Sequence, residues 1–156
     1  MTTYAAGLRV SEACALKVAD LDSTRIMIRV VQGKGAKDRY TLLSARLLKE
    51  LRRYWVTCRS TPYLFPAPRT PDMPMNAKAA QRIYYAARDR AGIAKDGGIH
   101  SLRHAFATHL LEAGVDVHTI QRVLGHGQIS TTMRYFHLAR EHLARTPLTA
   151  RPAGPT

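Results

Sequence analysis

The chain has 156 residues, of which 46% are hydrophobic and 22% are charged, so it is long and apolar enough to form one domain with a core. Lys and Arg number 24 against 11 Asp and Glu, which gives a formal net charge of +13 at pH 7. This composition excludes global disorder and favours a polyanion such as nucleic acid as the partner. A basic surface that only keeps the protein soluble is the alternative.

The sequence carries no pattern for a zinc site and none for a membrane span. Cys14 and Cys58 lie 44 positions apart and form no CxxC pair, so we expect two buried thiols in a reduced, cytoplasmic protein. No apolar run approaches the ~20 residues of a membrane helix. The first residues also lack the long apolar region of a signal peptide.

The first predicted element is a short helix close to the N-terminus. Residues 9–18 have helical spacing of apolar side chains, and Ser11 is the expected cap. Arg9 stands just ahead of this helix, where a phosphate can be bound. Residues 20–23 read as a turn.

A basic β-hairpin is predicted next. Residues 24–31 are rich in β-branched side chains and alternate as a strand does, and residues 40–43 form the returning strand. Residues 33–39 make a glycine-rich, basic turn between them. The turn would hold Lys34 and Arg39 where a DNA backbone can approach. Its glycines do not have the spacing of a nucleotide-binding P-loop.

The rest of the chain predicts a mainly helical fold. Residues 56–75 contain five prolines and read as a surface loop, and the tail from residue 147 is expected to be disordered. The fold class is therefore α+β, mainly α-helical with a small antiparallel β-sheet. The predicted helices span residues 44–55, 76–92, 101–113 and 117–124, and a further one begins near residue 130.

Five short motifs, in a fixed order, carry a resemblance to a known family. Together they resemble the catalytic domain of the tyrosine recombinases, of the phage integrase and Xer type. The resemblance implies a catalytic domain over residues 1–146, followed by a tail over 147–156. Members of the family usually also have an N-terminal DNA-clamping domain, and this sequence is expected to depart from the family by lacking it. The motifs are GLRVSE at 7–12, GKGAKDR at 33–39, HSLRH at 100–104, LGH at 124–126, and STTMRY at 130–135.

The resemblance implies that Tyr135 is a nucleophile. It lies nine residues after His126, as in the family pattern. The phenol would attack the scissile phosphate, form a 3′-phosphotyrosyl link and release a 5′-hydroxyl. Because the link keeps the bond energy, a second DNA end can reverse the step without ATP. A free phenol has a pKa near ~10, so it needs help to lose its proton at neutral pH.

The same resemblance assigns roles to the cationic side chains. Arg9 and Arg103 would bind the phosphoryl oxygens in fork geometry. His100 would help with the tyrosine proton, and His126 would donate a hydrogen bond to a phosphoryl oxygen. Lys34 would be the general acid for the departing 5′ oxygen.

Supporting and DNA-contacting residues complete the expected site. Glu12 would orient its neighbours, while Lys37 and Arg39 would contact DNA. No metal or other cofactor is expected, because cations of the chain take over charge stabilisation. The HxxxH spacing of His100 and His104 fits zinc, but neither the glutamate of an HExxH motif nor a third ligand accompanies it.

The expected partner is double-stranded DNA, with self-association into a tetramer on the DNA and a monomer without it. The protein would be cytoplasmic and close to the nucleoid, with no membrane and no small-molecule substrate. Two other functions stay open at this point. One is supercoil relaxation of the type IB topoisomerase kind, and the other is a truncated DNA-binding remnant without recombinase activity.

Overall fold

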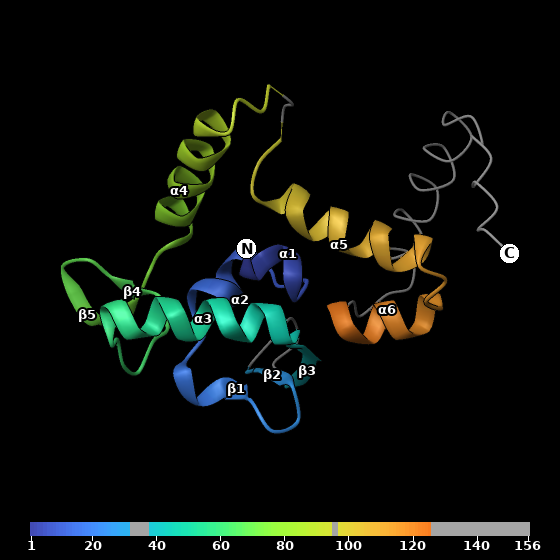
Figure 1. Cartoon of the computed structure of the whole chain (residues 1–156), viewed down its shortest axis with the longest axis horizontal. Coiled ribbons are helices and arrows are strands. Elements are labelled where there is room, and N and C mark those ends of the chain that lie inside the picture. The colour runs from blue at the N-terminus through green and yellow to red at the C-terminus, as the bar shows by residue number, and fades with distance from the viewer. Residues whose placement is uncertain (32–37, 95–96, 126–156) are drawn as a thin grey trace, which may run out of the picture.

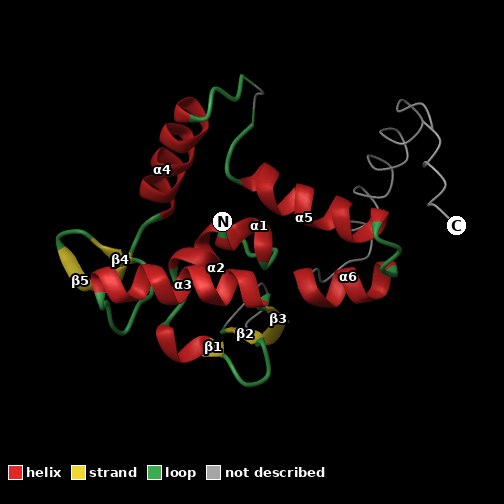
Figure 2. Cartoon of the chain, viewed as in Figure 1, coloured by secondary structure: helices red, strands yellow, loops and turns green. Residues whose placement is uncertain are grey.

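The computed structural model describes residues 1–31, 38–94 and 97–125, in which helices predominate and two small antiparallel sheets lie at the periphery (Figures 1 and 2). This part of the chain confirms the mainly helical α+β class. The helices are α1 (Thr2–Ala5), α2 (Val10–Cys14), α3 (Ala45–Cys58), α4 (Ala77–Arg90), α5 (His100–Glu112) and α6 (Val117–Leu124), with a 3-10 turn at Val18–Asp20. The strands are β1 (Leu21–Asp22), β2 (Met27–Val30), β3 (Arg39–Leu42), β4 (Pro66–Ala67) and β5 (Thr70–Pro74).

The larger sheet is an antiparallel meander in which β2 pairs with both β1 and β3. The two predicted strands and their antiparallel pairing are confirmed, whereas residues 32–37 of the predicted turn lie outside the described residues. The turn expected at residues 20–23 is wrong in part, because Leu21–Asp22 form β1. The carboxylate of Asp22 then accepts hydrogen bonds from the backbone N–H groups of Thr24 and Arg25. These bonds stabilise the reversal into β2.

Polar side chains cap three of the predicted helices and fix where they begin. Ser44 accepts a hydrogen bond from the backbone of Leu47, and Asn76 and Asp116 do the same at the starts of α4 and α6. Each bond satisfies a backbone donor that the first helical turn leaves without a partner. The predicted helices 44–55, 76–92, 101–113 and 117–124 are confirmed to within a few residues.

Three local expectations are wrong. The first short helix begins at Val10, so Ser11 lies inside it and is not its cap. The loop predicted over residues 56–75 contains the end of α3 and the β4–β5 hairpin. Cys14 is buried as expected, but Cys58 is exposed at the end of α3.

The apolar face of α3 packs against the inner face of the larger sheet and the segment before α2. A second cluster joins α5 to α6, which lie side by side in Figure 1. The same packing sets α6 against β3 and α1 against α5, so segments far apart in sequence meet. The largest fully buried side chains are Leu8, Ile28, Leu43, Leu47, Leu64, Ile120 and Leu124.

Gly7 marks the point where the first segment meets α5. Its φ is +61°, and an added Cβ would lie 2.5 Å from the ring of the buried Phe106. We expect Gly7→Ala to lower the free energy of unfolding by about 2 to 4 kcal/mol, from backbone strain and overpacking together. Gly114 has a φ of +81° with open space around it, so Gly114→Ala should cost only about 1 kcal/mol. Urea unfolding of both variants measures the difference, and equal losses would contradict this packing.

No helix in the described part of the chain has the length and apolar character needed to cross a bilayer.

Candidate active site

The carboxylate of Glu12, on α2, lies at the centre of a cluster of arginines and is only 9% exposed. Arg9 donates from Nη1 to Oε1 over 2.7 Å, and its backbone N–H donates to Oε2 over 2.7 Å. Arg39, on β3, donates from both terminal nitrogens, over 2.8 and 2.9 Å. Nη1 of Arg103, on α5, lies 3.5 Å from Oε2. We call these four residues the Glu12 cluster.

Backbone carbonyls hold the guanidinium of Arg103 on two further sides. Its Nη1 donates to the carbonyl of Gly7 over 2.5 Å, and its Nη2 donates to that of Leu124 over 2.6 Å. The side chain is 7% exposed. Arg103 therefore joins the segment before α2, helix α5 and the end of α6.

The other two arginines also reach the end of α6. Nε of Arg39 donates to the carbonyl of Val123 over 3.1 Å, and Nη2 of Arg9 donates to that of Gly125 over 3.3 Å. No buried side-chain nitrogen or oxygen lacks a hydrogen-bond partner among the residues that the structure describes. The cluster is thus tied by charge and by hydrogen bonds from four segments of the chain.

The environment of Glu12 keeps it ionised. Burial alone would raise the pKa of this carboxyl. The hydrogen bonds from Arg39 and from the backbone and side chain of Arg9, with the charge of Arg39, outweigh burial and lower the pKa from 4.5 to about 2. Glu12 therefore carries its negative charge at every pH at which the protein would work.

This lowered pKa predicts a loss of stability in acid. The folded pKa lies below the unfolded one, so the stabilisation is present above about pH 4.5 and is lost as the pH falls towards 2. The full contribution is about 3 kcal/mol. Urea unfolding between pH 6 and pH 3 would measure the loss for the natural chain and for Glu12→Gln. The difference in unfolding free energy between the two should shrink as the pH falls, and a constant difference would contradict the prediction.

Three guanidiniums around one carboxylate leave the Glu12 cluster with a net charge of +2. Arg39 and Arg103 are 11% and 7% exposed, whereas Arg9 is 26% exposed and is the most open of the three. A buried excess of positive charge is stabilised by an anion. An arginine fork that opens to solvent suits the oxygens of a phosphodiester.

His100 opens α5 and is exposed, one helical turn before Arg103. Residues spaced by three lie on the same side of a helix, so His100 and Arg103 face the same way. Burial, and then the positive charges of His100 and Arg103, lower the pKa of the neighbouring His104. The expected site residues Lys34, Lys37, His126 and Tyr135 lie outside the described residues.

The structure brings together Arg9, Glu12 and Arg103, as the sequence motifs suggested. It places Arg39 elsewhere than expected. This side chain was predicted to contact DNA, but its guanidinium points inward and lies against Glu12. The carbonyls of Gly7 and of residues 123–125 were not anticipated as acceptors. Their only signal in the sequence is their place within or beside the first and fourth motifs.

No group of three His, Cys, Asp or Glu side chains with the spacing of a metal site is present in residues 1–31, 38–94 and 97–125.

The sequence matches the family model described as "Phage integrase family" over residues 1–142. The chain belongs to the phage integrase family. It is 43% identical over 152 residues to the tyrosine recombinase XerA of Thermococcus onnurineus, an alignment that covers 95% of this chain and 52% of XerA. It is 39% identical over 137 residues to a tyrosine recombinase of Pseudothermotoga lettingae, covering 86% of this chain and 46% of that protein.

Solved structures of the family have the same fold. The crystal structure of XerA recombinase superposes with a TM-score of 0.80 at 32% identity, over 96% of this chain and 57% of that one. XerH site-specific recombinase, bound to palindromic difH substrate in a post-cleavage complex, gives 0.76 at 25% identity, over 91% and 41%. The family member described here thus spans about half the length of the relatives it matches.

Proposed function

We propose that this chain is the catalytic domain of a site-specific tyrosine recombinase, which cleaves and rejoins DNA strands through a 3′-phosphotyrosyl intermediate. The observation that carries the proposal is the Glu12 cluster. Its net positive charge comes from residues of three family motifs, and the guanidinium of Arg9, the most exposed of the three, suits a phosphoryl oxygen. Tyr135 would attack the phosphorus while the guanidiniums of Arg9 and Arg103 bind the developing negative charge.

The remaining roles complete the reaction. His100 would take up the proton of Tyr135, His126 would donate a hydrogen bond to a phosphoryl oxygen, and Lys34 would protonate the departing 5′ oxygen. The electron pair of the broken P–O bond leaves with that oxygen, and the attack of a second 5′-hydroxyl on the phosphotyrosine reverses each step. The protons and electron pairs of these steps balance with groups of the protein and the DNA alone.

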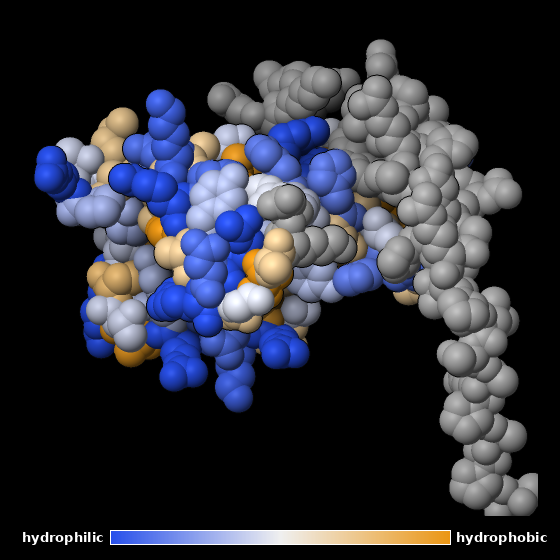
Figure 3. All heavy atoms as spheres, turned by 90° about the horizontal axis from the view of Figure 1, so that it is seen from above, coloured by the Kyte–Doolittle hydropathy of each residue, from blue (hydrophilic) through white to orange (hydrophobic). Residues whose placement is uncertain are grey.

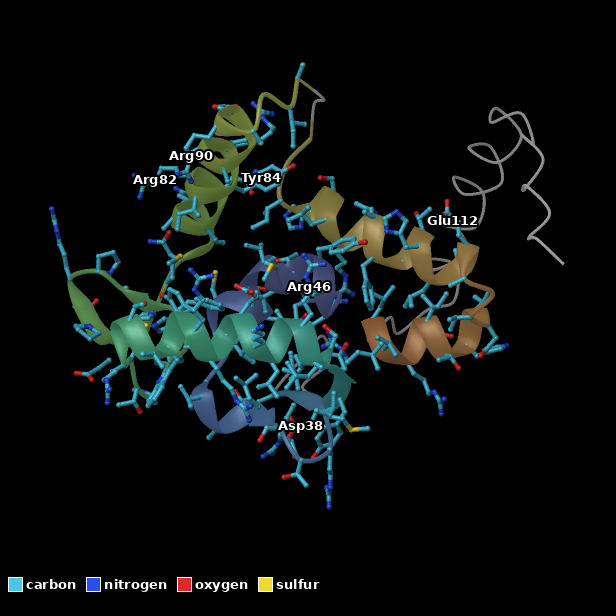
Figure 4. All side chains as sticks on the ribbon, viewed as in Figure 1. Asp38, Arg46, Arg82, Tyr84, Arg90 and Glu112 are labelled. Atoms are coloured by element: carbon cyan, nitrogen blue, oxygen red, sulfur yellow. The ribbon has the colours of Figure 1, made fainter. Side chains whose placement is uncertain are left out.

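The surface charge supports DNA as the substrate. Figure 3 shows hydrophilic side chains over most of the visible described surface, with small and scattered hydrophobic patches. In Figure 4, Arg82 and Arg90 lie on the side of α4 away from α5, whereas Tyr84 points towards α5. Because phosphate contacts release bound counterions, we expect the DNA affinity to fall steeply with salt. The exposed basic side chains of α3 and α4 are Arg46, Lys49, Arg52, Arg53, Lys78, Arg82 and Arg90.

Capture of the covalent intermediate tests the proposal. Duplexes bound by the purified chain would first be selected from a random library at low salt. Versions with a nick one to three bases from each candidate cleavage site would then trap the intermediate, because the short 5′ fragment diffuses away. We expect a protein–DNA adduct that survives denaturation, with DNA attached to the peptide that contains Tyr135. Tyr135→Phe, which keeps the ring and loses the hydroxyl, is the control.

The outcomes separate the candidate functions. An adduct in the natural chain that is absent in Tyr135→Phe supports the proposal. DNA binding without any adduct would favour a DNA-binding remnant. Relaxation of supercoiled plasmids without a selected sequence would favour a topoisomerase. Assembly into a tetramer on DNA stays a prediction, which light scattering of the complex would measure.

A further inference from the structure

We propose that Arg39 is a positioning residue, which holds Glu12 and the end of α6 so that the guanidiniums of Arg9 and Arg103 are set for a phosphoryl group. This rests on the proposed function, and it replaces the expectation that Arg39 contacts DNA. Arg39 is the first residue of β3.

The donors of Arg39 are directed into the protein. Its terminal nitrogens form a fork on the two oxygens of Glu12, at 2.8 and 2.9 Å, and its Nε donates to Val123 over 3.1 Å. A guanidinium is planar, so these three bonds fix its orientation. All three nitrogens of this guanidinium already donate within the protein, so Arg39 is poorly placed to meet a phosphate on the surface.

Close packing adds to these bonds. A Cβ added to Gly125 would lie 2.6 Å from Cδ of Arg39, so the backbone at the end of α6 rests directly on this side chain. The same end of α6 supplies the carbonyls of Leu124 and Gly125, which accept hydrogen bonds from Arg103 and Arg9. Arg39 thus contacts both the carboxylate and the segment that orient the other two guanidiniums.

The fork of Arg39 also holds each oxygen of Glu12 beside a different second arginine. Each oxygen of Glu12 receives one bond from Arg39, and each also faces a second arginine: Oε1 accepts from the side chain of Arg9, and Oε2 lies 3.5 Å from Arg103. Without the fork, the carboxylate could rotate towards one arginine and leave the other. Holding both oxygens keeps both guanidiniums in place.

The test compares Arg39→Gln and Arg39→Lys with the natural chain, and Arg29→Gln is the matched control. Arg29 lies on the neighbouring strand and pairs over 2.7 Å with Asp38 in an exposed ion pair. Lysine keeps the charge of Arg39 but cannot form the fork. Thermal melting of each variant confirms that it is folded. If Arg39→Gln does not fold, the phosphate affinity of Arg39→Lys decides the matter.

The first measurement is independent of any cleavage activity. Carbon-13 NMR of the Glu12 carboxyl follows its titration, and nitrogen-15 NMR of Nε of Arg9 follows binding of inorganic phosphate. The charged groups that face Glu12 are Arg9 before its own helix, Arg39 from β3 and Arg103 from α5. Loss of one close positive charge should raise the pKa of Glu12 by about 1 to 3 pH units in Arg39→Gln. Phosphate affinity should fall about tenfold in both Arg39 variants and stay unchanged in Arg29→Gln.

The second measurement uses the covalent adduct on the selected nicked duplex. In Arg39→Gln, Glu12 becomes protonated at a higher pH than in the natural chain, so the ratio of natural to variant rate should grow as the pH falls from 6 to 4. A purely structural defect gives a constant ratio. A constant ratio, with the pKa of Glu12 and the phosphate affinity unchanged, would overturn the inference.

The two proposals can fail separately. Absence of an adduct in the natural chain would count against recombinase chemistry, while the NMR measurements would still decide the role of Arg39.

Discussion

Glu12→Gln is expected to lower the free energy of unfolding by about 3 to 5 kcal/mol. The substitution keeps the shape of the side chain and removes the only negative charge of the Glu12 cluster. Two guanidiniums that are 11% and 7% exposed would then lose this carboxylate as a counter-ion. The new amide would also direct an N–H group at a guanidinium, which has only donors. Urea unfolding at pH 7 measures this loss.

An exposed ion pair provides the control for Glu12→Gln. Asp89 pairs with Arg88 over 3.0 Å on the surface of α4, where the Asp89 side chain is 65% exposed. Asp89→Asn should change the free energy of unfolding by less than about 1 kcal/mol. If both variants lost the same small amount, Glu12 would not be the carboxylate that holds the cluster together.

Arg9→Lys should reduce the rate of adduct formation by about 10²- to 10³-fold and leave the fold almost intact. Lysine keeps the charge but binds a phosphoryl group as a single point, without the fork. Arg9 is the most exposed arginine of the cluster, so its loss leaves little buried charge without a partner. The change in unfolding free energy should stay below about 1 kcal/mol.

Single-turnover kinetics on the selected nicked duplex measures the effect of Arg9→Lys. Arg25→Lys is the control, because its side chain is 75% exposed in the turn between β1 and β2, away from the Glu12 cluster. That variant should react at the natural rate. A similar rate for Arg9→Lys would show that the fork of Arg9 does not bind the reacting phosphate.

Sequence patterns predicted the helices well, because their spacing and caps are local signals. The same patterns predicted that Arg39 faces DNA, whereas its side chain faces inward. In β3 the polar side chains face the protein and apolar ones face solvent, which is the reverse of a usual surface strand. Tyr40 and Leu42 are 53% and 47% exposed, whereas Thr41 is 3% exposed and its hydroxyl donates to the carbonyl of Ala6. A strand whose polar residues face inward cannot be oriented from hydropathy alone. Its inner face is polar because it adjoins the Glu12 cluster.

The motifs correctly joined Arg9, Glu12 and Arg103, although these residues lie up to 94 positions apart. The acceptors at Gly7 and Leu124 could not be predicted in the same way. A carbonyl oxygen belongs to every residue, so its use as a hydrogen-bond partner leaves no mark in the residue type. What brings these carbonyls to Arg103 is the packing of α1 on α5 and of α6 on β3, which depends on the whole fold.

The wide spacing of the Glu12 cluster along the chain has a consequence during synthesis. Arg9, Glu12 and Arg39 leave the ribosome some 85 residues or more before the carbonyls of Leu124 and Gly125. A nascent chain therefore carries two of the three guanidiniums of the Glu12 cluster long before it carries the carbonyls that hold them. The cluster can be assembled only after residue 125 has been translated.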